Sequence, residues 1–383
     1  MPASATDEPR GLLARLRQKR VLVCVGAGGV GKTTTSAALA LGLARRGQRV
    51  AVVTIDPARR LASALGLTEL PSEPRRVEVA QLAEQSGEDG IESGELWAMM
   101  LDAKHTFDEL IARLAPDEHA REEILANPVY RELSTAVAGS HELSAIAKLY
   151  ELYEEHDFDV IVLDTPPSRN ALDFLDAPGR LLGFLEGRAL QVFLGPGGLT
   201  ARVFGRGTAL VFAIFARVTG VDMLGELSRF FRALSGVIGA FGERTRSVEE
   251  LLRDEHTSFV IVTSPEPEPA LEARFLAERL TAAGMPVGAL IVNRVHTHGL
   301  HGFSVDEVTQ LLTGALGASL AARMAGNLAD FDVLVQRDRE TIARLSRAGT
   351  GSAPLPAPVL VPHLDEDVQD LVGLGRIAEH LLD

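Results

Sequence analysis

One octet, GAGGVGKT at residues 26–33, constrains the fold of this chain more than any other feature. It matches the pattern G-x-x-x-x-G-K-[ST]. An apolar run at 21–25 precedes it, and an alanine-rich helical pattern at 33–46 follows it. A strand, a glycine-rich loop and a helix in this order form the context in which the pattern binds phosphate. The octet therefore predicts a nucleoside-triphosphate site rather than a glycine-rich turn that binds nothing.

The residue types in the octet suit phosphate chemistry. Glycines let consecutive backbone N–H groups converge on phosphate oxygens, and the following helix N-terminus adds a partial positive charge. Lys32 offers charge to the β- and γ-phosphates and is predicted to be catalytic, while Thr33 offers a hydroxyl to Mg²⁺. The expected cofactors are ATP and Mg²⁺. The predicted nucleotide-binding residues of this loop are Gly26, Ala27, Gly28, Gly29, Val30, Gly31, Lys32, Thr33 and Thr34.

Further short apolar runs have the composition of buried strands, and helical patterns such as 269–283 lie between several of them. This alternation is typical of a parallel sheet covered by helices. The predicted fold class is α/β, with a doubly wound, mostly parallel sheet of the P-loop NTPase type and an inserted α-helical subdomain. The expected strands after the first are 50–55, 96–101, 160–163, 259–263, 289–292 and 358–361.

Two connections, 102–159 and 164–258, are too long for simple crossovers and must carry structure of their own. The first holds helical patterns at 104–114 and 141–155, and the second holds an apolar stripe at helical spacing over 223–241. The stripe is either the core of its own subdomain or a surface for a partner. We expect a polar N-terminal segment at 1–20, a P-loop ATPase domain at 21–103, 157–178 and 257–383, and a helical insertion subdomain at 104–156 and 179–256.

Two carboxylates follow predicted strands. Asp164 ends the run 160–163, and Asp56 ends the strand 50–55. The carboxyl ends of parallel strands meet at one edge of a sheet, where ligands bind. We expect Asp164 to support Mg²⁺ through a water molecule and Asp56 to act in catalysis by orienting the attacking water. The alternative for Asp56 is a helix N-cap.

Composition narrows the partners. The chain has 38 Lys and Arg against 52 Asp and Glu, so no overall positive field draws it to nucleic acid or an anionic bilayer. No apolar run reaches the ~20 residues of a membrane span, and residues 2–20 show no signal peptide. Cys24 is the single cysteine, so no disulfide forms within the chain. We expect a cytoplasmic protein, with peripheral membrane association as an option.

Several motifs in order resemble those of the ArsA-type ATPases, which include arsenite-pump ATPases and ATPases that target tail-anchored membrane proteins. The first and second switches resemble 56–58 and 164–168, and the likeness spans nearly the whole chain. The family's adenine-reading Asn resembles Asn293, followed by Arg294, and its proline-bearing loop after the last strand resembles 361–364. The resemblance implies further nucleotide-binding residues, which are Asn293, Arg294, Pro362, His363 and Leu364.

The resemblance also implies a function. Members of the family are ATPases that act as nucleotide-gated dimers, whose helical subdomains form a client or effector surface. The leading hypothesis is a dimeric ATP-hydrolysing switch that handles a hydrophobic or membrane-protein client. The alternative is the ATPase subunit of a transport system that docks on a membrane partner. A partitioning ATPase is a third class, but the basic DNA surface or basic C-terminal helix that it requires is lacking.

Two departures qualify the resemblance. Related P-loop proteins carry a signature lysine where this chain has Ala27, so we expect slow hydrolysis unless other cations act. Arg59, Arg60 and Arg169 are candidates, as is a heterodimer with a lysine-bearing paralogue in place of a homodimer. The targeting branch also carries a Cys-x-x-Cys zinc clasp, which this chain lacks, and arsenite recognition uses several thiols. Zinc binding by the histidines near this position is not expected; they are His296, His298 and His301.

Overall fold

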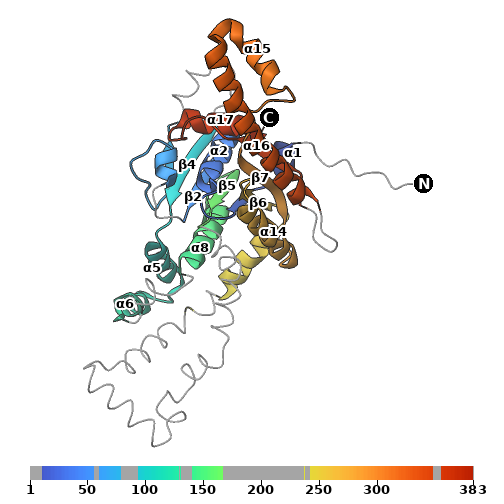
Figure 1. Cartoon of the computed structure of the whole chain (residues 1–383). Helices are drawn as coiled ribbons and strands as arrows, with labels where there is room; N and C mark the ends of the chain where they lie inside the picture. Colours follow the sequence, from blue (N-terminus) through green and yellow to red (C-terminus); the bar gives the residue numbers. More distant parts are fainter. Residues whose placement is uncertain are drawn as a thin grey trace, which may run out of the picture. The chain divides into compact units, whose positions relative to one another are not determined.

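The computed structural model describes residues 11–55, 60–78, 94–128, 130, 140–166, 237, 242–347 and 355–382 (Figure 1). The chain divides into two compact units, each with its own set of elements. Unit 1 comprises Met1–Met100, Asp157–Leu172 and Arg253–Asp383. Unit 2 comprises Leu101–His156 and Asp173–Leu252.

Unit 1 is built on an eight-stranded sheet with the order β3-β4-β2-β5-β1-β6-β7-β8. All neighbouring strands run parallel except β3 and β4, which are antiparallel. The predicted α/β fold with a mostly parallel sheet is therefore confirmed. The strands are β1 (Val21–Val25), β2 (Arg49–Thr54), β3 (Arg75–Val77), β4 (Glu95–Met100), β5 (Val160–Asp164), β6 (Thr257–Thr263), β7 (Val287–Val295) and β8 (Pro358–Pro362).

The burial of the central strands explains why their positions could be predicted from the sequence. Every residue of β1, β5 and β6 is buried, which matches the apolar runs at 21–25, 160–163 and 259–262. The strand β3 was not expected, because its three residues include the exposed Arg75 and Arg76. The strand β1 lies between β5 and β6. Strands β2 to β5 lie on one side of β1, and strands β6 to β8 lie on the other side, so the strand order reverses at β1. Ligands of such sheets bind at this switch point, outside the carboxyl ends of the strands.

Helices cover both faces of the sheet. On one face α2 (Lys32–Ala44) packs against α17 (Leu371–Leu382), and Ile291 of β7 joins their apolar cluster. The adjacent Val292 must point to the opposite face, because side chains alternate along a strand. It packs there with Ala270 and Leu345, which belong to α14 (Pro267–Ala282) and α16 (Ala318–Ser346). Unit 1 also has two short helices, α1 (Leu12–Leu16) and α3 (Arg60–Ala64).

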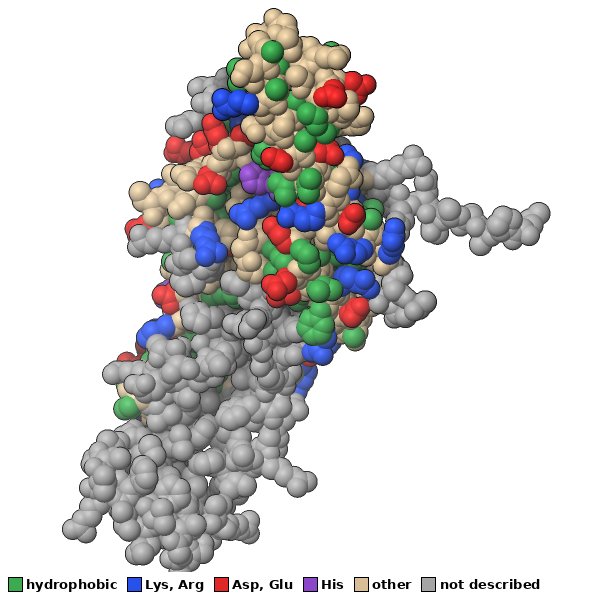
Figure 2. Space-filling model, viewed as in Figure 1, with side chains coloured by type: hydrophobic (Ala, Val, Ile, Leu, Met, Phe, Trp, Pro, Cys, Tyr) green, Lys and Arg blue, Asp and Glu red, His purple; other side chains and the backbone are tan. Residues whose placement is uncertain are grey.

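A helical hairpin of α15 (Val305–Leu316) and α16 lies between β7 and β8 in the chain. Ser304 and Glu307 form a capping box at the start of α15, and Gly317 joins the two helices. Hydrophobic side chains are visible on the upper part of the face in Figure 2. The exposed apolar residues of this hairpin and its N-terminal flank are Phe303, Val305, Leu311, Leu316, Leu320, Met324, Phe331 and Val333.

The described helices of unit 2 include α5 (Ala103–Leu114), α6 (Glu118–Ala126) and α8 (Ser140–Glu155), and residues 242–252 are helical as well. The helices α5 and α8 match the helical patterns expected at 104–114 and 141–155, whereas α6 was not expected. Asp102 and Asp117 cap α5 and α6 by accepting backbone N–H bonds at 2.9 and 2.8 Å. The stripe at 223–241 lies outside the described residues, apart from the buried, helical Val237. Among the described helices, none is long and apolar enough to cross a membrane.

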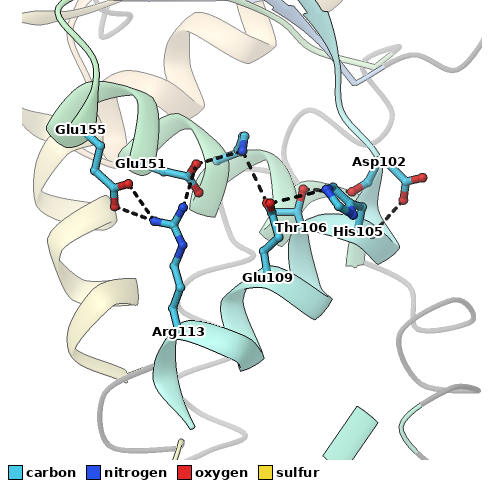
Figure 3. A network of polar contacts seen from close by, with 8 residues as sticks. Asp102, His105, Thr106, Glu109, Arg113, Glu151 and Glu155 are labelled. Atoms are coloured by element: carbon cyan, nitrogen blue, oxygen red, sulfur yellow. Dashed lines mark hydrogen bonds and ion pairs between the residues drawn. The ribbon is translucent and has the colours of Figure 1, made fainter. Parts of the chain in front are cut away.

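An ion-pair network joins α5 to α8 within unit 2 (Figure 3). The buried Lys148 ammonium lies 2.8 Å from a Glu151 carboxylate oxygen and 3.4 Å from one of Glu109. The Arg113 guanidinium donates to both oxygens of Glu155, at 2.6 and 2.8 Å. Because the Lys148 side chain is only 2 % exposed, its charge depends on these carboxylates for stabilisation.

Candidate functional site

The loop between β1 and α2 bends Lys32 back over its own backbone. The Lys32 ammonium donates to the carbonyl oxygens of Gly26 and Ala27, at 3.0 and 2.8 Å. Its side chain is buried, and α2 begins at this residue. The lysine therefore lies along the loop whose N–H groups are predicted to receive phosphate. Thr33 and Thr34 occupy the first turn of the same helix.

Two glycines of the loop are required by their neighbours. A Cβ atom on Gly26 would lie 1.9 Å from the carbonyl oxygen of Val262 in β6. Gly31 has φ +88°, in the left-handed region, and a Cβ there would lie 2.3 Å from the Asn293 side-chain nitrogen. The loop is thus packed against the ends of β6 and β7, where a side chain on either glycine would displace backbone or a buried amide.

Asp164 occupies the centre of the sheet edge. The Thr33 hydroxyl donates to Asp164 Oδ2 across 2.8 Å, and the Thr54 hydroxyl donates to the same oxygen across 2.9 Å. Asp164 is fully buried, and the parallel register pairs it with Cys24 on one side and Thr54 on the other. A threonine hydroxyl beside a carboxylate is the donor set with which P-loop proteins hold Mg²⁺. These residues therefore fit the predicted ion.

Thr54 belongs to this site although the sequence motifs did not predict it. It is the last residue of β2 and shares the Asp164 oxygen with Thr33. Aligning the ends of strands 50–55 and 160–163 would have indicated it, because both strands reach the same edge. Asp56, the predicted catalytic residue two positions later, lies outside the described residues, as do Arg59 and Arg169. Arg60 is described and is the exposed first residue of α3.

Cys24 lies beneath this site and is chemically protected. The pKa of its thiol is raised to about 12, chiefly by burial; the hydrogen bond with Ser36 and the charge of Lys32 lower the pKa, and the Asp164 carboxylate adds to the increase. The Thr165 hydroxyl donates to the Cys24 carbonyl oxygen at 2.7 Å. A buried thiol held in its neutral form is a poor ligand and nucleophile. Cys24 is thus part of the sheet core.

The end of β7 reaches the phosphate loop. The Asn293 amide nitrogen donates to the Val30 carbonyl oxygen at 2.9 Å, and the Arg294 guanidinium donates to the Gly29 carbonyl oxygen at 3.0 Å. Asn293 is buried, whereas Arg294 is exposed. The structure therefore places both predicted nucleotide-binding residues against the octet.

The loop after β8 lies beside the end of β7. Pro362 pairs with Val295 in the sheet register, and the His363 N–H donates to the Val295 carbonyl oxygen at 2.9 Å. The His363 ring stacks on that of His296, with centroids 5.5 Å apart and planes at 14°. Leu364 is partly buried and packs against the main core. The three predicted residues of this loop, 362–364, thus follow the last strand close to residues 293–296.

A buried carboxylate, not anticipated from the sequence, fixes His296. Asp338 on α16 is fully buried and accepts from the His296 backbone N–H at 3.0 Å. It also bonds the His296 Nδ1 at 2.8 Å. No local pattern separates Asp338 from the many other polar residues of a long helix. Among the described residues, neither His296 nor His298 nor His301 belongs to a cluster of three possible metal ligands.

Comparisons with known proteins agree with this geometry. The sequence model described as anion-transporting ATPase matches residues 19–196, which include the octet, Thr54 and Asp164. A protein of Aquifex aeolicus named as a putative arsenical pump-driving ATPase is 28% identical over 286 residues. That alignment covers 72% of this chain and 63% of the Aquifex protein, which is less than two thirds of its length.

Two fungal relatives extend the comparison. ATPase GET3 of Malassezia globosa is 27% identical over 283 residues, covering 72% of each chain. ATPase GET3 of Podospora anserina is 27% identical over 280 residues, covering 73% of this chain and 74% of the relative. The likeness thus extends beyond the region that the family model matches. Together with the sheet order and the arrangement around Asp164, these matches support the resemblance of the chain to the ArsA-type ATPases.

Proposed function

We propose that this chain is an ATPase that binds ATP and Mg²⁺ at the octet and couples nucleotide state to its helical unit. The observation that carries the proposal is the convergence of Lys32, Thr33 and Asp164 at one sheet edge, with hydrogen bonds of 2.8–3.0 Å. Similarity to known and named ATPases supports nucleotide binding in general.

Each residue has a defined task in this proposal. The loop N–H groups hold phosphate oxygens, and Lys32 leaves its two carbonyl partners to neutralise the β- and γ-phosphates. Thr33 and Asp164 are the residues that would hold Mg²⁺, the threonine by its hydroxyl group and the carboxylate through a water molecule. Mg²⁺, when bound, neutralises charge that develops on the transferring phosphoryl group. Asp56 orients the attacking water.

Ala27 makes hydrolysis by the chain alone slow. The methyl group of Ala27 carries no charge, so residue 27 supplies no cation to a phosphate on a partner subunit. A cation at the transferring phosphate raises phosphoryl-transfer rates by ~10³-fold or more. A lysine-bearing paralogue in a heterodimer, or Arg59, Arg60 or Arg169, supplies the charge. An ATPase rate that is unchanged when such a paralogue is added would rule out the heterodimer.

The two units correspond in this proposal to an ATPase domain and a helical insertion subdomain. The helical unit of a dimer handles a hydrophobic or membrane-protein client in the cytoplasm, at times beside a membrane. The support is the apolar stripe in the sequence at 223–241 and the family resemblance. The described face carries Lys and Arg intermixed with Asp and Glu, without a continuous basic patch that would favour nucleic acid (Figure 2).

Client handling is tested with a fluorescent peptide that carries a single transmembrane segment. The purified chain is titrated into the peptide with Mg²⁺ and either a non-hydrolysable ATP analogue or ADP. We expect at least about tenfold tighter binding in one of the two nucleotide states, a coupling of ordinary size for two linked sites. A polar peptide of equal length serves as the control. Equal affinity in both states, or binding to the polar control, would contradict the coupling.

The second candidate is the ATPase subunit of a transport system. It is favoured by the family description and by the relative named as a putative arsenical pump-driving ATPase. In this case the chain co-purifies with one integral membrane protein rather than with a varied set of clients. Arsenite itself is a poor candidate effector, since the chain's single cysteine, Cys24, is buried.

A further inference from the structure

Two side chains from the end of β7 bond consecutive carbonyl groups of the phosphate loop. Arg294 donates to Gly29 and Asn293 donates to Val30, at 3.0 and 2.9 Å. Lys32 bonds the carbonyls of Gly26 and Ala27 earlier in the same loop. Side-chain donors therefore cover carbonyl groups on both sides of Gly28.

These contacts matter because of the geometry that an anion requires. A loop binds phosphate when consecutive N–H groups turn toward the ligand, and its carbonyl groups then turn away from it. The carbonyl group of the buried Val30 needs a hydrogen-bond partner of its own, and the carbonyl group of the exposed Gly29 is held in place by a protein partner instead of water. Asn293 and Arg294 supply these partners at Val30 and Gly29. The two residues therefore stabilise a loop conformation with N–H groups directed at the ligand.

The backbone of Arg294 supports a dedicated role. Its φ is +61°, one of two positive values among the described non-glycine residues. Such a conformation is unfavourable for residues with a Cβ and persists when surrounding contacts impose it. Gly31 contributes from the other side, since a Cβ there would occupy the position of the Asn293 amide. The positive φ of Arg294 and the glycine at residue 31 thus both accompany the packing of residues 293 and 294 against the loop.

We propose that Asn293 and Arg294 form a clamp that holds the phosphate loop in its anion-binding shape. They are positioning residues, and this inference rests on the proposed ATP site. Base reading by Asn293 is compatible with the clamp, because an amide offers two donors and one acceptor. The clamp makes a prediction that base reading does not. Loss of either side chain weakens phosphate ligands that have no base.

The test compares Mg²⁺-ATP with Mg²⁺-tripolyphosphate as probes of the full chain. Affinities are measured by calorimetry for wild type, Asn293→Ala, Arg294→Ala and Arg294→Gly. We expect each variant to bind tripolyphosphate about tenfold more weakly, as the loss of one hydrogen bond that shapes a site would give. The affinity of each variant for ATP should fall by at least the same factor. If ATP binding weakens while tripolyphosphate binding is unchanged, Asn293 only reads the base and the clamp is wrong.

Matched variants separate the clamp from a general loss of structure. Arg294→Gly keeps the positive φ without strain, so its unliganded melting temperature should equal or exceed that of wild type. Arg294→Lys retains a donor and should recover part of the tripolyphosphate affinity. Wild-type affinity in Arg294→Gly would overturn the Arg294 contact. If wild type binds neither probe, the proposed ATP site fails and the clamp fails with it.

Discussion

Thr33 donates a hydrogen bond to Asp164 across 2.8 Å, joining the first turn of α2 to the last residue of β5. Thr54 donates to the same oxygen from the end of β2. Three elements therefore meet at one buried carboxylate. In the proposed ATPase this carboxylate supports Mg²⁺, so its charge should matter more than its shape.

Replacing Asp164 by Asn tests that charge. Asn retains an oxygen that accepts from Thr33 and Thr54, so the fold should persist. We expect Mg²⁺-dependent ATP hydrolysis to fall by at least about 100-fold, because the ion loses its anionic support. Phosphate release is measured at several Mg²⁺ concentrations, with circular dichroism as the control. Wild-type Mg²⁺ dependence in a folded Asp164→Asn protein would contradict the metal assignment.

Substituting two glycines of the loop separates backbone strain from steric conflict. Gly29 and Gly31 both have positive φ, but only at Gly31 would an added Cβ meet another atom within 4 Å. Gly29→Ala should cost only the left-handed strain of about 1–2 kcal/mol. Gly31→Ala should also displace Asn293 and weaken ATP binding by at least about a further tenfold, the effect expected for loss of the Asn293 contact. Calorimetric titration with ATP measures the affinity of each variant. Equal effects of the two substitutions would contradict the close packing of Gly31 against Asn293.

Cys24 should make stability fall at high pH. Its pKa is raised to about 12 in the folded protein, from an ordinary value of 9.0. The stabilisation is therefore complete below pH ~9 and is lost as pH rises toward 12, because the unfolded chain releases the proton first. Between pH 8 and pH 10 wild type should lose about 1.4 kcal/mol more than Cys24→Ala.

Denaturant unfolding at the two pH values measures this difference. Alkylation supplies a second readout, since the native thiol should resist N-ethylmaleimide until the protein is unfolded. The same pH dependence in wild type and Cys24→Ala, or rapid alkylation of native protein, would show that the thiol is accessible.

The ion-pair network of unit 2 should depend on Lys148. Lys148→Ala removes the ammonium 2.8 Å from Glu151, whose side chain is 9% exposed, and leaves it with the Arg113 guanidinium at 3.3 Å. Breaking a buried pair in this way costs about 3–5 kcal/mol. Arg121→Ala is the matched control, because its pair with Glu118 is exposed and should contribute less than about 1 kcal/mol. Thermal unfolding compares the two, and similar shifts would contradict a structural role for the network.

Much of the fold could be predicted because the central strands are buried on both faces. An apolar run such as 160–163 therefore indicates a strand, and the polar residue after it, Asp164, indicates where the strand reaches the edge of the sheet. The short β3 escaped because its arginines lie exposed on an edge strand. Local sequence carries no record of pairing with β4, which depends on residues about 20 positions later.

The site was predictable only in part. Glycines, Lys32 and Thr33 form a local motif, so their positions follow from adjacent residues. Thr54 and Asp338 act through contacts with distant segments, at Asp164 and His296. The bond between Asn293 and Val30 likewise depends on how two loops meet in space. No fixed spacing in the sequence predicts such contacts, because they form between segments that meet only in the folded chain.

The central claim, an ATP site built on Lys32, Thr33 and Asp164, is tested most directly by ATP binding and turnover of the purified full chain. Wild type should bind ATP only with Mg²⁺ and release phosphate slowly. Lys32→Ala should lower turnover by at least about 100-fold while the unliganded protein stays folded. Wild type that binds no ATP, or Lys32→Ala with wild-type turnover, would contradict the account.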